Sequence, residues 1–198
     1  LTLYASDRGA MQGRASKKNT VTRWFQERHP RYVLDMRITN GGSMSDIIDS
    51  LPEDPAVIAS MDVTIVICNC NKGGKRVKAQ PYAAQSSQGA DMVKLCLELK
   101  KHKRPVLFIA GTDEQWKFPP DVAKKWDIMA TQLKAIANRM GIMCIDGQVH
   151  YDHMKSAKDG WHFVNDVETT DVMVDMLTDA VNAVYGAIPN GSYATVQR

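Results

Sequence analysis

Five short runs rich in apolar and β-branched residues alternate with longer stretches of helical character, and this alternation constrains the fold more than any other feature. The strand-like runs cover residues 1–6, 32–39, 63–70, 106–111 and 142–147. Such alternation is typical of a parallel sheet that carries helices on both faces and is joined by right-handed crossovers. We therefore predict a doubly wound α/β domain.

The stretches between these runs repeat apolar residues every three or four positions, which marks the buried face of a helix. In the clearest of them the repeating residues are Val122, Trp126, Met129, Leu133, Ile136 and Met140. Pro120 and Asp121 are typical of a helix start, and Gly141 is typical of a helix end. Further helices are expected over residues 20–28, 45–51, 90–102 and 165–185.

Length and composition indicate one domain. The chain has 198 residues, of which 44% are hydrophobic, and it shows neither an internal repeat nor a low-complexity block. We expect a domain over residues 1–188 and a flexible tail over residues 189–198. No apolar run is long enough for a membrane span. The chain starts at Leu1 without an initiator methionine or a signal-peptide pattern, so we expect part of a longer protein or a processed product.

The four cysteines suggest an intracellular protein. Cys68, Cys70, Cys96 and Cys144 lie within apolar periodic segments, and no Cys-x-x-Cys pair is present. Free buried thiols in a reducing compartment explain this pattern better than a disulfide framework. The net charge of +3 is too small by itself to indicate nucleic-acid binding.

Polar or glycine-rich sequence follows each strand-like run, where ligands bind in open parallel sheets. These segments are residues 6–9, 40–43, 69–74 and 111–114, with residues 159–162 ahead of the last helix. Turns alone require such residues, so no single segment is informative. None carries a nucleotide-binding fingerprint, and His150, Asp152 and His153 lack further ligands. We therefore expect neither a cofactor nor a metal.

Taken together, the segments resemble the four blocks of the SGNH (GDSL) hydrolase family. Ser6-Asp7-Arg8 stands at the Gly-Asp-Ser block, and residues 41–47 (GGSMSDI) are similar to the second block. The third block, Gly-x-Asn-Asp, keeps only Asn71, with Lys72 at the aspartate position. Asp159-Gly160-Trp161-His162 matches the fourth block, Asp-x-x-His. The resemblance reaches to about residue 185 and implies a flavodoxin-like, three-layer α/β/α fold with five parallel strands in the order 2-1-3-4-5.

The family's reaction assigns a role to each block. Serine attacks an acyl carbonyl, histidine removes its proton and aspartate orients the histidine. The resemblance implies that Asp159 and His162 hold the last two roles, and that Gly41 and Asn71 contact the oxyanion. Arg8 occupies the serine position, and a protonated guanidinium cannot attack a carbonyl. Loss of the nucleophile costs roughly six orders of magnitude in turnover, so we interpret the chain as a degenerate member.

Two displaced nucleophiles remain open as alternatives. Ser6 lies two positions before Arg8, and a shifted turn would place it at the reacting carbon. Cys70 adjoins Asn71 and would act as a thiolate beside a cation, although a packed strand-end thiol explains it much better.

The departures from the family blocks add positive charge where the first and third blocks are expected to meet. The cations are Arg8, Lys72, Lys75 and Arg76. In the third block, Gly73-Gly74 is expected to expose backbone N–H groups beside them. This cluster favours phosphate or carboxylate ligands over neutral esters. The competing interpretation is a salt bridge from Arg8 to Asp7 or Asp159, with the lysines solvated. Some serine-lacking members of this fold bind RNA, which by analogy adds a polyanion to the candidate ligands.

The sequence thus leaves three functions. The first is a catalytically degenerate binding or assembly module for an anionic ligand such as RNA or phosphate, or for a protein partner in a larger assembly. The second is an active acyl-ester hydrolase that uses Ser6 with Asp159 and His162. The third is a structural subunit of a larger complex.

Overall fold

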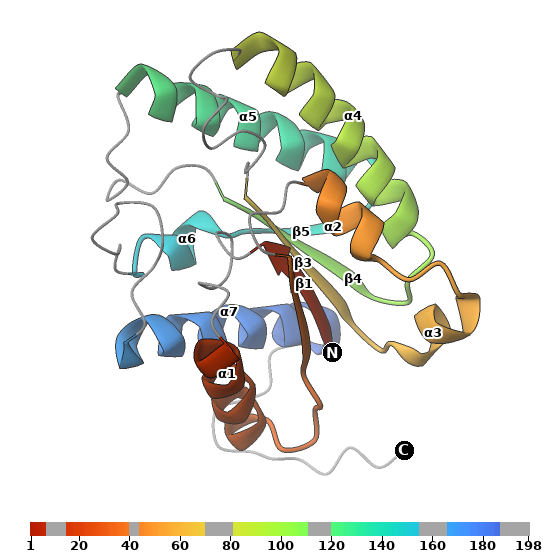
Figure 1. The fold of residues 1–198 in the computed structure, drawn as a ribbon, viewed down its shortest axis with the longest axis vertical. Coiled ribbons are helices and arrows are strands. Elements are labelled where there is room, and N and C mark those ends of the chain that lie inside the picture. The colour runs from red at the N-terminus through yellow and green to blue at the C-terminus, as the bar shows by residue number, and fades with distance from the viewer. Residues whose placement is uncertain (7–14, 40–43, 70–80, 111–119, 155–165, 187–198) are drawn as a thin grey trace.

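A computed structural model of the chain describes residues 1–6, 15–39, 44–69, 81–110, 120–154 and 166–186 (Figure 1). Its elements, in chain order, are β1 (Thr2–Ser6), α1 (Ala15–Arg28), β2 (Asp35–Thr39), α2 (Met44–Ser50), α3 (Pro55–Ser60), β3 (Thr64–Asn69), α4 (Pro81–Leu99), β4 (Pro105–Ala110), α5 (Pro120–Arg139), β5 (Met143–Asp146), α6 (Gln148–Tyr151) and α7 (Val167–Tyr185). None of the helices in these ranges has both the length and the hydropathy to cross a bilayer.

The five strands form one parallel sheet in the order β2-β1-β3-β4-β5, which confirms the predicted fold class and strand order. The register aligns the starts of neighbouring strands: Thr2 pairs with Asp35 on β2 and with Thr64 on β3, and Thr64 pairs with Pro105 on β4. All carboxyl ends therefore meet at one edge of the sheet and all amino ends at the other.

Helices cover both faces of the sheet. Figure 1 shows α1 and α7 packed together on one face, with α2, α4 and α5 on the other. The central strands β3 and β4 are buried from Val63 to Cys68 and from Val106 to Ile109, as expected when both faces of a parallel sheet are covered. The predicted stripe on α5 is buried at Met129 and Leu133 and half-buried at Ile136.

Several boundaries differ from the predicted ones. β2 begins at Asp35 and not at residue 32, because Tyr32 N–H donates to the His29 carbonyl in a turn after α1 (3.0 Å). α4 begins at Pro81, nine residues before the apolar periodicity becomes visible. α3 was not predicted, although its start carries the usual signal: Pro55 is the first helical residue, and the Asp54 carboxylate accepts from Ala56 N–H (2.8 Å).

The start of α7 depends on one capping side chain. Asp166 has extended backbone, and its carboxylate accepts a hydrogen bond from Thr169 N–H (2.8 Å). We expect Asp166→Ala to lower the free energy of unfolding by about 1 kcal/mol, because an N–H of the first turn loses its acceptor. Chemical denaturation measures the change. Asp166→Asn, which keeps an acceptor oxygen, is the control, and equal losses in both variants would contradict the capping role.

Candidate functional site

Three of the four family-like blocks leave the sheet from adjacent strands. β1 ends at Ser6, β2 at Thr39 and β3 at Asn69, and Ser6 pairs with Thr39 across the sheet. Counted along the chain, the block residues Arg8, Gly41 and Asn71 each follow the last residue of their strand by two positions. The topology therefore starts all three segments from the carboxyl edge of β2, β1 and β3.

α7, which follows the fourth block in the sequence, begins towards the same edge. At its C-terminal end, the Tyr185 ring lies 5.9 Å from the Tyr32 ring, and the Arg104 guanidinium lies over it at 5.2 Å. Tyr32 and Arg104 precede β2 and β4, so this end of α7 lies at the amino edge. A 19-residue helix is about 28 Å long, and its capping residue Asp166 therefore lies towards the carboxyl edge. The segment with Asp159 and His162 connects α6, which follows the end of β5, to Asp166.

Most of the predicted site residues lie outside the described residues. They are Arg8, Gly41, Cys70, Asn71, Lys72, Lys75, Arg76, Asp159 and His162. Ser6 is described through its backbone: it is the last residue of β1 and is paired in the sheet. A nucleophile at Ser6 would thus stand within the strand, two positions before Arg8 in the sequence.

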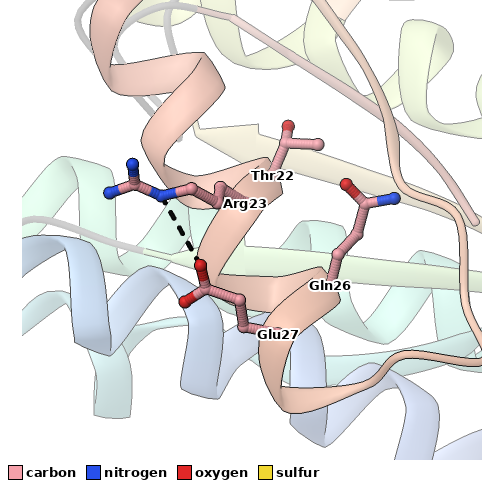
Figure 2. Close-up of a pocket in the computed structure, with 4 residues that line it drawn as sticks. All are labelled: Thr22, Arg23, Gln26 and Glu27. Carbon is pink, nitrogen blue, oxygen red and sulfur yellow. Dashed lines mark ion pairs between the residues drawn. The ribbon is translucent and has the colours of Figure 1, made fainter.

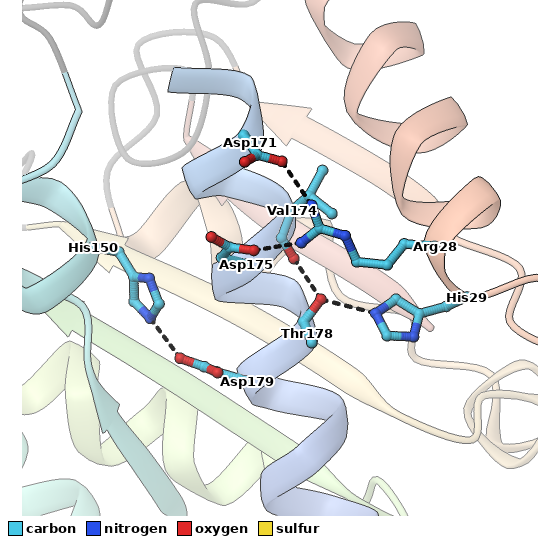
Figure 3. Close-up of polar contacts among 8 residues, drawn as sticks. All are labelled: Arg28, His29, His150, Asp171, Val174, Asp175, Thr178 and Asp179. Atoms are coloured by element: carbon cyan, nitrogen blue, oxygen red, sulfur yellow. Dashed lines mark hydrogen bonds and ion pairs between the residues drawn. The ribbon is translucent and has the colours of Figure 1, made fainter. Parts of the chain in front are cut away.

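Two histidines are tied to α7 by contacts that the sequence did not reveal (Figure 3). His150 on α6 is 8% exposed, its Nε2 lies 3.0 Å from an Asp179 carboxylate oxygen, and its ring meets Phe108 edge-on at 6.2 Å. His150 belongs to the short helix α6, which the sequence did not predict, and its contact with Asp179 fixes that helix against α7. Within the described ranges no cluster of three metal-ligating side chains is found.

The other histidine belongs to a polar network between α1 and α7 (Figure 3). The Arg28 guanidinium donates to Asp171 (2.6 Å) and to Asp175. The Thr178 hydroxyl donates to the Val174 carbonyl (2.8 Å), so it accepts from His29 Nε2 at 2.8 Å. Burial, and then the charge of Arg28, lowers the pKa of His29, so the ring is neutral with its proton on Nε2. The network holds the two helices together.

An open depression on α1 is lined by Thr22, Arg23, Gln26 and Glu27 (Figure 2). All four residues come from a single helix. Arg23 and Glu27 form an exposed ion pair at 3.7 Å with the four-residue spacing common on helix surfaces. This depression brings no second element and no unpaired charge together, so it does not constitute a site.

The described cysteines are poor nucleophiles. Cys68 and Cys96 are buried and Cys144 is half-buried, and none of the three forms a disulfide. Burial raises the pKa of Cys96, and it raises the pKa of Cys144 to about 11. The thiols of Cys96 and Cys144 therefore stay protonated at neutral pH, and all three cysteines pack in or against the core.

Comparison with known proteins identifies the fold. No protein-family model matches the chain, and no curated protein matches it in sequence. Among solved structures it is similar to an acetylxylan esterase from Geobacillus stearothermophilus, with a TM-score of 0.66 and 19% identity over 94% of each chain. It is also similar to an α/β hydrolase enzyme from the metagenome of Lake Arreo, Spain, with a TM-score of 0.68 and 13% identity over 92% of this chain and 95% of that one. A further acetyl xylan esterase gives a TM-score of 0.68 and 11% identity over 90% and 98%. At these identities the likeness establishes a hydrolase-like fold.

Proposed function

We propose that the chain is an SGNH-hydrolase-like domain that binds an anionic ligand at the carboxyl edge of its sheet instead of cleaving esters. The observation that carries this proposal is that β1, β2 and β3, which three of the family-like blocks follow in the sequence, end at one edge of a sheet whose fold is similar to that of acetyl xylan esterases. Arg8 at the position of the family's nucleophile supports binding over acyl transfer.

The residues available at this edge suit phosphate or carboxylate groups, including the phosphates of RNA. A guanidinium such as that of Arg8 binds such groups through two parallel hydrogen bonds. Lys72, Lys75 and Arg76 would add charge, while Gly41 and Asn71 would donate N–H groups to an anion oxygen as they would to an oxyanion. Asp159 and His162 would complete the pocket wall. A protein partner that presents acidic side chains would use the same groups.

The second candidate is an active acyl-ester hydrolase. It is favoured by the retained Asp159-x-x-His162 pattern, because a site that only binds has no catalytic need for that pair. Ser6 would then serve as the nucleophile from the last position of β1.

Hydrolysis of p-nitrophenyl acetate separates the two candidates. We expect the wild-type chain to give no turnover above the spontaneous rate of ester hydrolysis. Arg8→Ser should exceed that spontaneous rate roughly a hundredfold or more, because the other members of the site would again have a nucleophile. That gain should disappear in Arg8→Ser combined with His162→Ala. Wild-type turnover that is lost in both Ser6→Ala and His162→Ala would overturn the binding proposal in favour of the hydrolase.

Ligand binding is tested directly with inorganic phosphate and with acetate. Under the proposal, millimolar phosphate or acetate raises the Tm of the wild-type chain, since a ligand that binds only the native state stabilises it. Arg8→Ala should lose this shift, whereas Lys124→Ala, which removes an exposed charge from α5, should keep it. No shift in the wild-type chain with either anion would contradict a small-anion site.

A further inference from the structure

The amino edge of the sheet, opposite the candidate site, carries a concentrated positive charge. The turn between α4 and β4 exposes four basic side chains, those of Lys100, Lys101, Lys103 and Arg104, and buries His102 between them. Arg104 lies directly before β4, and its carbonyl accepts from Thr64 N–H (3.1 Å). The turn therefore crosses the edge from the face covered by α4 to the face covered by α7.

Aromatic side chains from two other parts of the chain lie at the end of this turn. The Tyr185 ring is 43% exposed at the end of α7, with the Arg104 guanidinium over it at 5.2 Å. The half-buried Tyr32 supports that ring from the segment before β2, with ring centroids 5.9 Å apart and planes 39° apart. Three segments that are distant in sequence thus build one exposed platform beside the lysines.

Exposed acidic side chains also lie at this edge, among them Asp35 at the start of β2, which pairs with Arg37 at 3.0 Å. Glu98 pairs with Lys101 at 2.6 Å, and Asp62 is exposed just before β3. Among the described contacts, no ion pair involves Lys100, Lys103 or Arg104. The net charge of the whole chain is only +3. Attraction of an anion would therefore come from this local cluster and not from the charge of the molecule as a whole.

We propose that the amino edge binds single-stranded nucleic acid, with backbone phosphates on Lys100 and Lys103 and a base stacked on the exposed pair formed by the Arg104 guanidinium and the Tyr185 ring. Lysine and arginine neutralise phosphates without reading sequence, and an exposed aromatic ring stacks on any base. A membrane or an acidic protein would use the charges but would gain nothing from the face of the ring. The surface is distinct from the site of the proposed function, since α7, about 28 Å long, separates the two edges.

The charges are tested by fluorescence anisotropy with a labelled single-stranded RNA of mixed sequence, and with single-stranded and duplex DNA of the same sequence. We expect Lys100→Ala combined with Lys103→Ala to weaken single-strand affinity roughly tenfold or more at low salt. The slope of log affinity against log salt should fall by about 1.4, because two phosphate contacts are lost. The matched control is Lys124→Ala with Lys125→Ala, which removes the same charge from exposed positions on α5. Thermal melts verify that the variants are folded.

The platform is tested separately with Tyr185→Leu. This change should weaken binding of both single strands by roughly tenfold, because one base loses its stacking partner, and should leave duplex binding unchanged. Several results would overturn the proposal: no wild-type binding at low salt, equal losses in the edge and control pairs, or no effect of Tyr185→Leu. Binding that is lost in Arg8→Ala but kept in the edge pair would also overturn it, and would place the nucleic acid at the site of the proposed function.

Discussion

Replacing Phe108 with alanine is expected to lower the free energy of unfolding by about 3–5 kcal/mol, because it removes a buried ring and leaves a cavity. Phe108 is 0% exposed in β4, between Ile67 of β3 and Ile145 of β5 in the sheet register. Its ring also meets His150 edge-on, so its loss would leave α6 without one of its supports on the sheet. Neighbours drawn from three elements cannot all move inwards to fill the space.

Chemical denaturation of both purified proteins measures this difference. Phe108→Leu is the matched control, because it keeps most of the apolar volume, and it should cost about 1.5 kcal/mol or less. A loss below that value in the alanine variant would mean that β4 and α6 collapse onto the vacated space. Phe108 would then not be the centre of a tightly packed core.

The second large effect is expected at a buried polar pair, Thr64 and His102, which joins β3 to the turn before β4. The Thr64 hydroxyl lies 2.8 Å from His102 Nδ1, and the two residues are 1% and 6% exposed. Burial lowers the pKa of His102, so the imidazole is neutral above pH 7. Thr64→Val keeps the shape of the side chain but leaves a buried ring nitrogen without its partner, which should cost about 1–3 kcal/mol.

Thr64→Ser provides the control, because it keeps the hydroxyl and loses only a methyl group. Urea unfolding at pH 7.5 should rank the wild type first, the serine variant second and the valine variant last. Equal stability of the valine variant and the wild type would show that water or a relaxed backbone replaces the hydroxyl. The hydrogen bond would then contribute nothing net.

Periodicity predicted most of the fold because the elements bury regular apolar faces. Two of the differences have clear physical reasons. The first part of α4, residues 81–89, contains glutamine, serine and glycine and has no apolar period, so nothing marked it as helical. At its end Gly89 lies close to α5, where an added Cβ would be 3.8 Å from Ile136 Cδ1. α3 has six residues, too few for a period to appear, and only its Asp54-Pro55 start was readable.

The candidate site was predictable as an edge of the sheet, because parallel strands fix where their carboxyl ends meet. The contacts that hold its surroundings together were not. His150 and Asp179 come from different helices, and nothing local in the sequence links them. The platform of Tyr32, Tyr185 and Arg104 likewise joins positions whose proximity is a product of the complete topology. Local patterns describe elements, whereas such sites arise between elements.

The pairing of α1 with α7 also governs the order in which the chain can fold. Arg28 and Asp175 are separated by 147 residues, and Phe25 on α1 is completely buried. During synthesis α1 emerges well before α7, so its apolar side lacks a cover until nearly the whole domain has been made. Contacts between such distant segments form late and slowly, and uncovered apolar surface promotes aggregation. Nascent chains of this protein should therefore depend on chaperones until α7 leaves the ribosome.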